Sequence, residues 1–124
     1  MKDKGTAVDI ARLLYERKAQ DIVVLHVAHL TVLTDYLVIA SGYNALQVKA
    51  LADYLDEKLG TIGLDLRRTE GAGDGRWIVM DYNNIIVHIF HHEDREYYRL
   101  DHLWSDGQNR LALPFVDVNA DAAE

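Results

Sequence analysis

The sequence contains no cysteine, one proline and no apolar run long enough to cross a membrane. Without thiols it has no disulfide framework, no thiolate metal site and no thiol nucleophile. A membrane helix needs about 18 consecutive apolar residues, so we expect no membrane partner. The opening stretch MKDKGTAVDI also lacks the apolar segment of a signal peptide, which predicts a cytoplasmic protein.

Basic residues are also scarce. Thirteen Lys and Arg stand against twenty Asp and Glu, giving a formal net charge of -7. The phosphate backbone of a nucleic acid repels such a chain unless a local basic patch exists, and Arg67 with Arg68 or Arg95 with Arg99 is too sparse. We therefore expect no direct nucleic-acid specificity, and a basic protein surface is the better partner.

The strongest structural signal is the segment 76–90, which reads RWIVMDYNNIIVHIF. Two short runs rich in Val, Ile, Trp and Phe flank Asp81, Tyr82, Asn83 and Asn84, which predicts a β-hairpin. The Asn pair suits the left-handed positions of a tight turn. Both alternating sets of side chains are largely apolar in each run. We expect one set to face helices and the other to form an apolar patch that suits a partner.

The remaining elements follow from periodicity. The chain opens with a helix in which Thr6 and Asp9 resemble a capping pair, and a second helix starts after Asn44. Strands are expected at 22–27, 36–40 and 64–69, the last near an edge, and a short charged helix at 91–104. This order predicts a single α/β domain, residues 1–104, with a mixed sheet of about five strands and the two longer helices packed on one face. The polar, acidic tail 105–124 is expected to be mobile.

Histidines suggest a metal site. His88, His91 and His92 precede Glu93 and Asp94, and imidazole with carboxylate suits zinc or iron. However, His88 falls in a strand, and adjacent histidines diverge on either a strand or a helix. We expect a hydrogen-bonded or solvated role for these side chains and no metal.

Signals for catalysis are weaker still. The turn SGYN precedes a helix, where backbone amides can bind phosphate, but no dinucleotide or phosphate-loop motif accompanies it. Asp65 is a lone carboxylate where a nucleotidyltransferase needs a pair to hold two metals. Ser41, His88 and Asp81 lack an elbow motif that would set the serine against a base. We expect a protein that is not an enzyme and needs no cofactor.

Aromatic residues gather in the C-terminal third of the chain: Trp77, Tyr82, Phe90, Tyr97, Tyr98 and Trp104. They exceed what one side of a hairpin and a short helix can readily bury. Because Trp, Tyr and Arg dominate interface hot spots, we expect part of this cluster to dock a partner. Acidic residues at its edge favour a basic one: Glu70, Asp81, Glu93, Asp94 and Asp101.

Several blocks carry a family resemblance. The runs KAQDIVVLHV, TDYLVIASGYNALQVKALAD, WIVMDYNNIIVHIF and REYYRLDHLW, in that order over residues 18–104, resemble the Iojap/RsfS family of ribosomal silencing factors. The resemblance implies a fold related to nucleotidyltransferases without their catalytic acids. It also implies binding to the large ribosomal subunit through its basic protein fourteen, which blocks joining of the small subunit and represses translation under nutrient limitation. A nucleotidyltransferase-like enzyme and an adaptor with another partner stay open as alternatives.

The family's hallmark residues match positions of this chain: Asp35, Gly42, Gln47, Glu70, Gly71, Trp77, Asp81, His88, Phe90, Arg95, Tyr98, Leu100, Leu103 and Trp104. Together with the hairpin they predict the partner-binding residues: Glu70, Trp77, Asp81, Tyr82, Asn84, His88, Phe90, Arg95, Tyr98 and Leu100. Asn83 and Asn84 depart from the family's Gly and Asp, which removes a charge at the second position. An apolar open face also predicts a homodimer.

Overall fold

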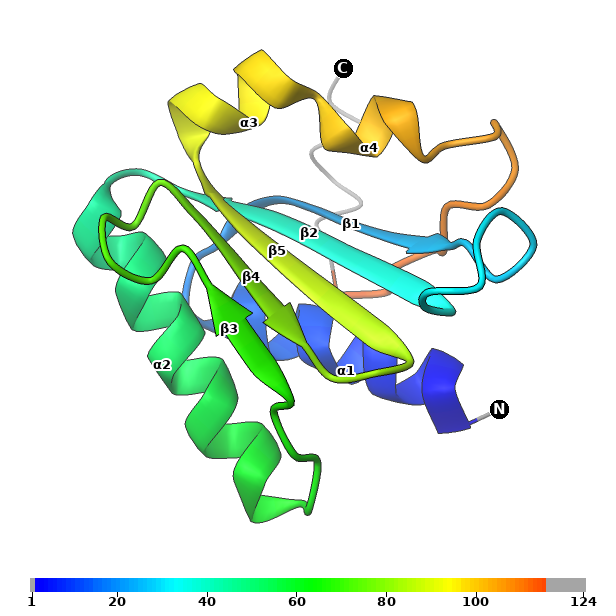
Figure 1. Cartoon of the computed structure of the whole chain (residues 1–124), viewed down its shortest axis with the longest axis horizontal. Coiled ribbons are helices and arrows are strands. Elements are labelled where there is room, and N and C mark those ends of the chain that lie inside the picture. Colours follow the sequence, from blue (N-terminus) through cyan, green and yellow to red (C-terminus); the bar gives the residue numbers. More distant parts are fainter. Residues whose placement is uncertain (1, 116–124) are drawn as a thin grey trace.

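The computed structural model describes residues 2–115. Its centre is a five-stranded mixed sheet in the order β1-β2-β5-β4-β3 (Figure 1). Only the central pair, β2 with β5, is parallel, and the other neighbours are antiparallel. The strands are β1 (Gln20–His26), β2 (Tyr36–Gly42), β3 (Arg68–Glu70), β4 (Trp77–Asp81) and β5 (Ile85–His91). This arrangement confirms the predicted α/β fold and its mixed sheet. The strand expected at 64–69 is shorter and later, at Arg68–Glu70, and it lies at the sheet edge.

Two long helices cover one face of the sheet, as predicted (Figure 1). They are α1 (Lys2–Glu16) and α2 (Ala45–Thr61). The cap of α2 is the expected one, because Oδ1 of Asn44 accepts a hydrogen bond from the Gln47 amide at 2.8 Å. The Gln47 side chain in turn accepts from the Tyr43 amide at 2.6 Å. By contrast, α1 already begins at Lys2, so Thr6 lies inside the helix and does not cap it.

The main core lies between these helices and the sheet. It contains the buried stripe of α2 and the inward-facing residues of the strands, among them Val24, Val38, Ile78, Val87 and Ile89. Every side chain of β2 is buried, as expected for a strand covered on both faces. The described helices include none that is both long and apolar enough to cross a membrane.

The opposite face is only partly covered. Where one helix was predicted over 91–104, the structure has α3 (His92–Tyr98) and α4 (Leu100–Leu103), lying across the sheet from α1 and α2 (Figure 1). Arg99 separates them because its φ of 51° is left-handed, which ends one helix and starts the other. Beneath them lies a second apolar cluster: Val23, Leu25, Val27, Leu37, Ile39 and Phe90. On this side β3 is exposed, and the outward side chains of β4 are only partly buried.

Residues 105–115, which belong to the tail expected to be mobile, make specific contacts with the sheet. Asn109 is buried, and its side-chain amide donates to the carbonyl oxygens of His26 at 3.0 Å and Trp104 at 2.9 Å. Arg110 forms a β-bridge with Leu25, which partly covers the free edge of β1. Sequence periodicity could not show this because the bonded groups are far apart in the chain. The rest of the predicted tail, 116–124, lies outside the described residues.

Candidate protein-binding surface

The strand register brings the predicted contact residues of β3, β4 and β5 to one surface. Glu70 pairs with Val79, and Val79 pairs with His88. Since directly opposed residues share a face of the sheet, these side chains form one row across three strands. A parallel row joins Asp81 to Ile86. We call this surface, turned away from α1 and α2, the open face.

Trp77 is the centre of the open face. Its ring centroid lies 4.7 Å from that of Phe90 and 4.7 Å from that of Tyr98, so it joins β5 to α3. Its indole Nε1 donates a hydrogen bond to Nδ1 of His88 at 3.0 Å. Trp77 is half-buried, while Tyr98 is 50% exposed. The two rings therefore present a wide apolar surface in one fixed orientation.

His88 is an uncharged acceptor at neutral pH. Burial lowers the pKa of its imidazole to about 4, because the charged form loses hydration. The hydrogen bond from Trp77 requires that Nδ1 carry no proton, which agrees with a neutral ring. The His88 side chain therefore holds the Trp77 ring in place.

The loop before β4 also supports Trp77. Gly71 has a φ of 83°, and a Cβ built on it would lie 1.9 Å from the carbonyl oxygen of Trp77. Only glycine permits both the left-handed backbone and this close approach. At the start of the same strand, Arg76 donates to Asp94 of α3 at 2.9 and 3.1 Å, an ion pair that the sequence did not reveal. The hydrogen bond to Asp94 raises the pKa of Arg76.

The other predicted contact residues that reach the surface lie in different structural environments. Glu70 is exposed on β3 and forms an ion pair with Arg68 at 3.0 Å. Asn84 is exposed at the hairpin turn, and its amide donates to Asp3 of α1 at 3.2 Å. Leu100 is half-buried and packs against the second apolar cluster. Thus Glu70 borders the open face, Asn84 lies at the hairpin turn, and Leu100 packs α4 onto the second apolar cluster.

Three predicted contact residues have buried side chains: Tyr82, Phe90 and Arg95. Tyr82 is 5% exposed and belongs to the main core, since the alternation that turns Asp81 outward turns the next residue inward. Burial first, and then the charge of Asp56, raise the pKa of its hydroxyl. Phe90 is fully covered by the rings above it. Little or none of these three side chains is exposed at the surface in this structure.

Arg95 joins three elements. Its guanidinium donates to Oγ of Ser41 at 2.9 Å and to Asp101 at 3.3 Å, which ties α3 to β2 and α4. Burial would raise the pKa of Asp101, but the charge and hydrogen bond of Arg95 lower it below its usual value. Arg95 therefore fixes the helices that frame the open face.

The hairpin turn needs one left-handed residue where the sequence suggested two. Asn83 has a φ of 79°, whereas Asn84 does not have a positive φ. The Asp81 carboxylate accepts a hydrogen bond from the Asn83 amide at 2.7 Å, and the Tyr82 amide donates to the Ile85 carbonyl at 2.9 Å. The side chain of Asn84 is thus free to contact α1.

Two histidines of the predicted cluster, His88 and His91, have different structural roles. His91 accepts a hydrogen bond from the Glu93 amide at 3.2 Å and caps α3, while His88 is bonded to Trp77. Within residues 2–115, no group of three or more His, Cys, Asp or Glu side chains is placed to hold a metal ion. The arrangement is suited to contact with another molecule through shape, aromatic area and charge.

A small apolar cavity adjoins the open face and was not anticipated. It has a volume of about 200 Å³ and lies between β5, the loop after β1, and α4. His88 and Ile86 form one wall, and Leu100 and Trp104 another. Since its walls come from distant parts of the chain, no local sequence pattern could have indicated it.

Comparison with known proteins identifies the relatives of this chain. The family model described as "Ribosomal silencing factor during starvation" matches residues 2–124. The ribosomal silencing factor RsfS of Bacillus subtilis is 32% identical over 106 residues, covering 86% of this chain and 90% of that protein. The RsfS of Chromobacterium violaceum is 35% identical over 100 residues, covering 81% and 82%. A crystal structure of a Chromobacterium violaceum protein shares the fold with a TM-score of 0.77 and 29% identity, covering 90% of this chain and 95% of that chain. The chain therefore belongs to the ribosomal silencing factor (RsfS) family.

Proposed function

We propose that this chain binds the large ribosomal subunit through its ribosomal protein fourteen and thereby prevents the small subunit from joining. Translation is repressed in this way when nutrients are scarce. The protein acts in the cytoplasm by occupying a surface, without catalysis and without a cofactor. Membership of the RsfS family supports a role in ribosomal silencing, since the relatives carry that role in their names.

The observation that carries the proposal is the pair of half-buried Trp77 and exposed Tyr98, with ring centroids 4.7 Å apart. Aromatic side chains held in place lose little entropy on binding and are frequent hot spots. Trp77 is already fixed by Phe90 and His88, so the surface is preorganised for docking. A contact centred there would bury about 800 Å² on each partner, the standard size of a specific interface.

Charge supports a basic partner. Asp81 lies on the open face, Glu70 borders it, and the chain as a whole carries a formal charge of -7. Such a field steers a basic protein toward the surface and repels exposed RNA backbone. The acidic side chains set orientation and encounter rate, while the aromatic pair provides most of the affinity.

Co-sedimentation with purified large subunits tests the proposal. Trp77→Ala or Tyr98→Ala is expected to weaken binding by about 2 kcal/mol, the loss typical of a hot spot. Tyr15→Ala is the matched control, because Tyr15 is 41% exposed but lies on α1, across the sheet from the open face. If both open-face variants sediment with large subunits as well as the control does, the docking surface lies elsewhere.

The open face also supports the proposal of a homodimer. Tyr97, Tyr98 and Leu103 expose 78%, 50% and 75% of their area on α3 and α4, beside half-buried Trp77. A two-fold pair that covers these groups would hide the patch until the ribosome competes for it. Light scattering should then show dimers of the wild type that dissociate when large subunits are added, and a weaker dimer for Trp77→Ala.

A further inference from the structure

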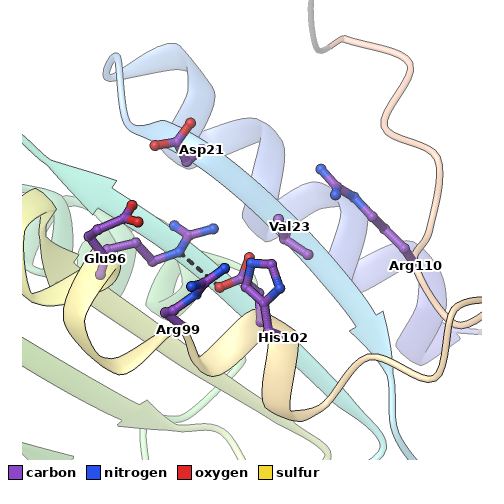
Figure 2. Close-up of a pocket in the computed structure, with 8 residues that line it drawn as sticks. Asp21, Val23, Glu96, Arg99, His102 and Arg110 are labelled. Atoms are coloured by element: carbon purple, nitrogen blue, oxygen red, sulfur yellow. Dashed lines mark hydrogen bonds and ion pairs between the residues drawn. The ribbon is translucent and has the colours of Figure 1, made fainter.

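A second recess lies at the opposite edge of the sheet from the open face. It is a cavity of about 320 Å³ between β1 on one side and α3 and α4 on the other (Figure 2). A neighbouring cavity of about 240 Å³ shares Val23, Asp101, His102 and Arg110 with it and adds Ser105. The two form one polar trough along β1, which we call the charged trough.

Basic side chains enter the charged trough from separate elements. Arg99 and His102 come from the junction of α3 and α4, and Arg110 comes from the segment that bridges β1 (Figure 2). Arg95 also lines it, but Asp101 already neutralises that guanidinium. Among the described residues, neither Arg99 nor Arg110 has a carboxylate within ion-pair distance.

Besides Asp101, the charged trough is lined by two acidic residues, and both lie toward one of its ends. Asp21 and Glu96 line the larger cavity only, and Figure 2 shows both away from Arg110. The smaller cavity is lined by His102, Arg110 and the hydroxyl-bearing Ser105, and among the described residues its one carboxylate, Asp101, is paired with Arg95. This end of the charged trough therefore has donors without an unpaired carboxylate, and Arg99 adds a further donor from the larger cavity.

The backbone at Arg99 adds a second observation. Its φ of 51° and ψ of 46° are left-handed values, which favour glycine or asparagine over arginine. Such strained positions gather at functional sites, and this one points to a role for the Arg99 side chain. The Arg99 guanidinium lines a cavity in which neither it nor Arg110 has an ion-pair partner among the described residues.

We infer that the charged trough binds the phosphate group of a small phosphorylated molecule, held by Arg99, His102 and Arg110. Guanidinium groups match phosphate oxygens with two parallel hydrogen bonds, and an imidazole provides a further donor. The overall charge of -7 disfavours a polymer of phosphates, so a compact ligand with one phosphate group fits better than nucleic acid. This site goes beyond the proposed function because it uses a different surface from the ribosome-docking one.

Titration of the full chain with inorganic phosphate, at ionic strength balanced with chloride, tests the inference. The His102 imidazole NMR signals should shift saturably, and calorimetry should give a matching dissociation constant. The double variant Arg99→Gly, Arg110→Gln should bind phosphate at least tenfold more weakly. Glycine suits the left-handed backbone at that position, so this variant keeps the fold, which its NMR spectrum verifies.

The double variant Arg67→Gln, Arg68→Gln is the matched control for charge, since both arginines are exposed at the β3 edge, far from the charged trough. It should bind phosphate like the wild type. Equal weak responses in all three proteins would show a general salt effect and overturn the inference. A short RNA without terminal phosphates that bound through the same arginines more tightly than phosphate would also overturn it, in favour of a nucleic-acid contact. Ribosomes are absent from the experiment, so its result is independent of the docking proposal.

Discussion

The indole of Trp77 and the imidazole of His88 are joined by a hydrogen bond of 3.0 Å between neighbouring strands of the sheet. Because the imidazole accepts this bond, it is neutral, and because the indole donates it, the ring cannot rotate away from the open face. A polar contact at the base of the surface thus orients its principal aromatic group.

His88→Phe should destabilise the fold and loosen Trp77. It leaves the indole N–H without its acceptor, which costs about 1 to 3 kcal/mol if the group stays out of water. Urea unfolding measures the loss. The double variant with Trp77→Phe is the control, since losses that added fully would show that the two side chains do not interact.

Stability should fall in mild acid because of His88. Its pKa is about 4 in the folded chain against 6.5 ordinarily, so between these values the unfolded chain binds more protons. The contribution is complete above pH 6.5 and is lost as the pH falls toward 4, by up to about 3 kcal/mol. Unfolding measured across this window should show a steeper slope for the wild type than for His88→Phe, and identical slopes would contradict the assignment.

Tyr82→Phe should leave stability unchanged or raise it by about 1 kcal/mol, because no hydrogen-bond partner for the buried hydroxyl is found in the described part of the chain. The variant should sediment with large subunits like the wild type, since Tyr82 faces α2. Loss of binding by this variant, with its fold intact, would return Tyr82 to the docking surface.

Arg95→Met should cost about 2 kcal/mol of folding stability by leaving Asp101 without its partner. Thermal unfolding detects this change. The Asp101→Asn variant is the comparison, since a similar loss in both would be expected of one shared ion pair. A neutral effect of Arg95→Met would mean that the pair does not hold α3 to α4.

Local signals in the sequence were sufficient for much of the fold. The cap at Asn44 and the hairpin over 76–90 each depend on residues close together in the chain, and both were predicted. The helix break at Arg99 could not be predicted, because an arginine in a left-handed conformation has no local sequence signature. The same holds for the bridge of Arg110 to Leu25, which depends on tertiary packing.

The exposure of the proposed contact residues could not be predicted from the sequence, for a geometric reason. Family resemblance and composition predicted a set of contact residues, but not which of them reach the surface. Phe90 and Arg95 hold the exposed groups in place, and Tyr82 lies on the other face of the sheet. One residue of shift along a strand decides between these outcomes, and the register became visible only in the structure.

Joining of ribosomal subunits, followed by light scattering, tests the central claim most directly. Large subunits are incubated with excess protein before small subunits are added, and Trp77→Ala is used at the same concentration as the control. We predict that the wild type suppresses the rise in scattering that marks subunit joining, and that the variant suppresses it much less. Normal joining in the presence of saturating wild-type protein would contradict the account.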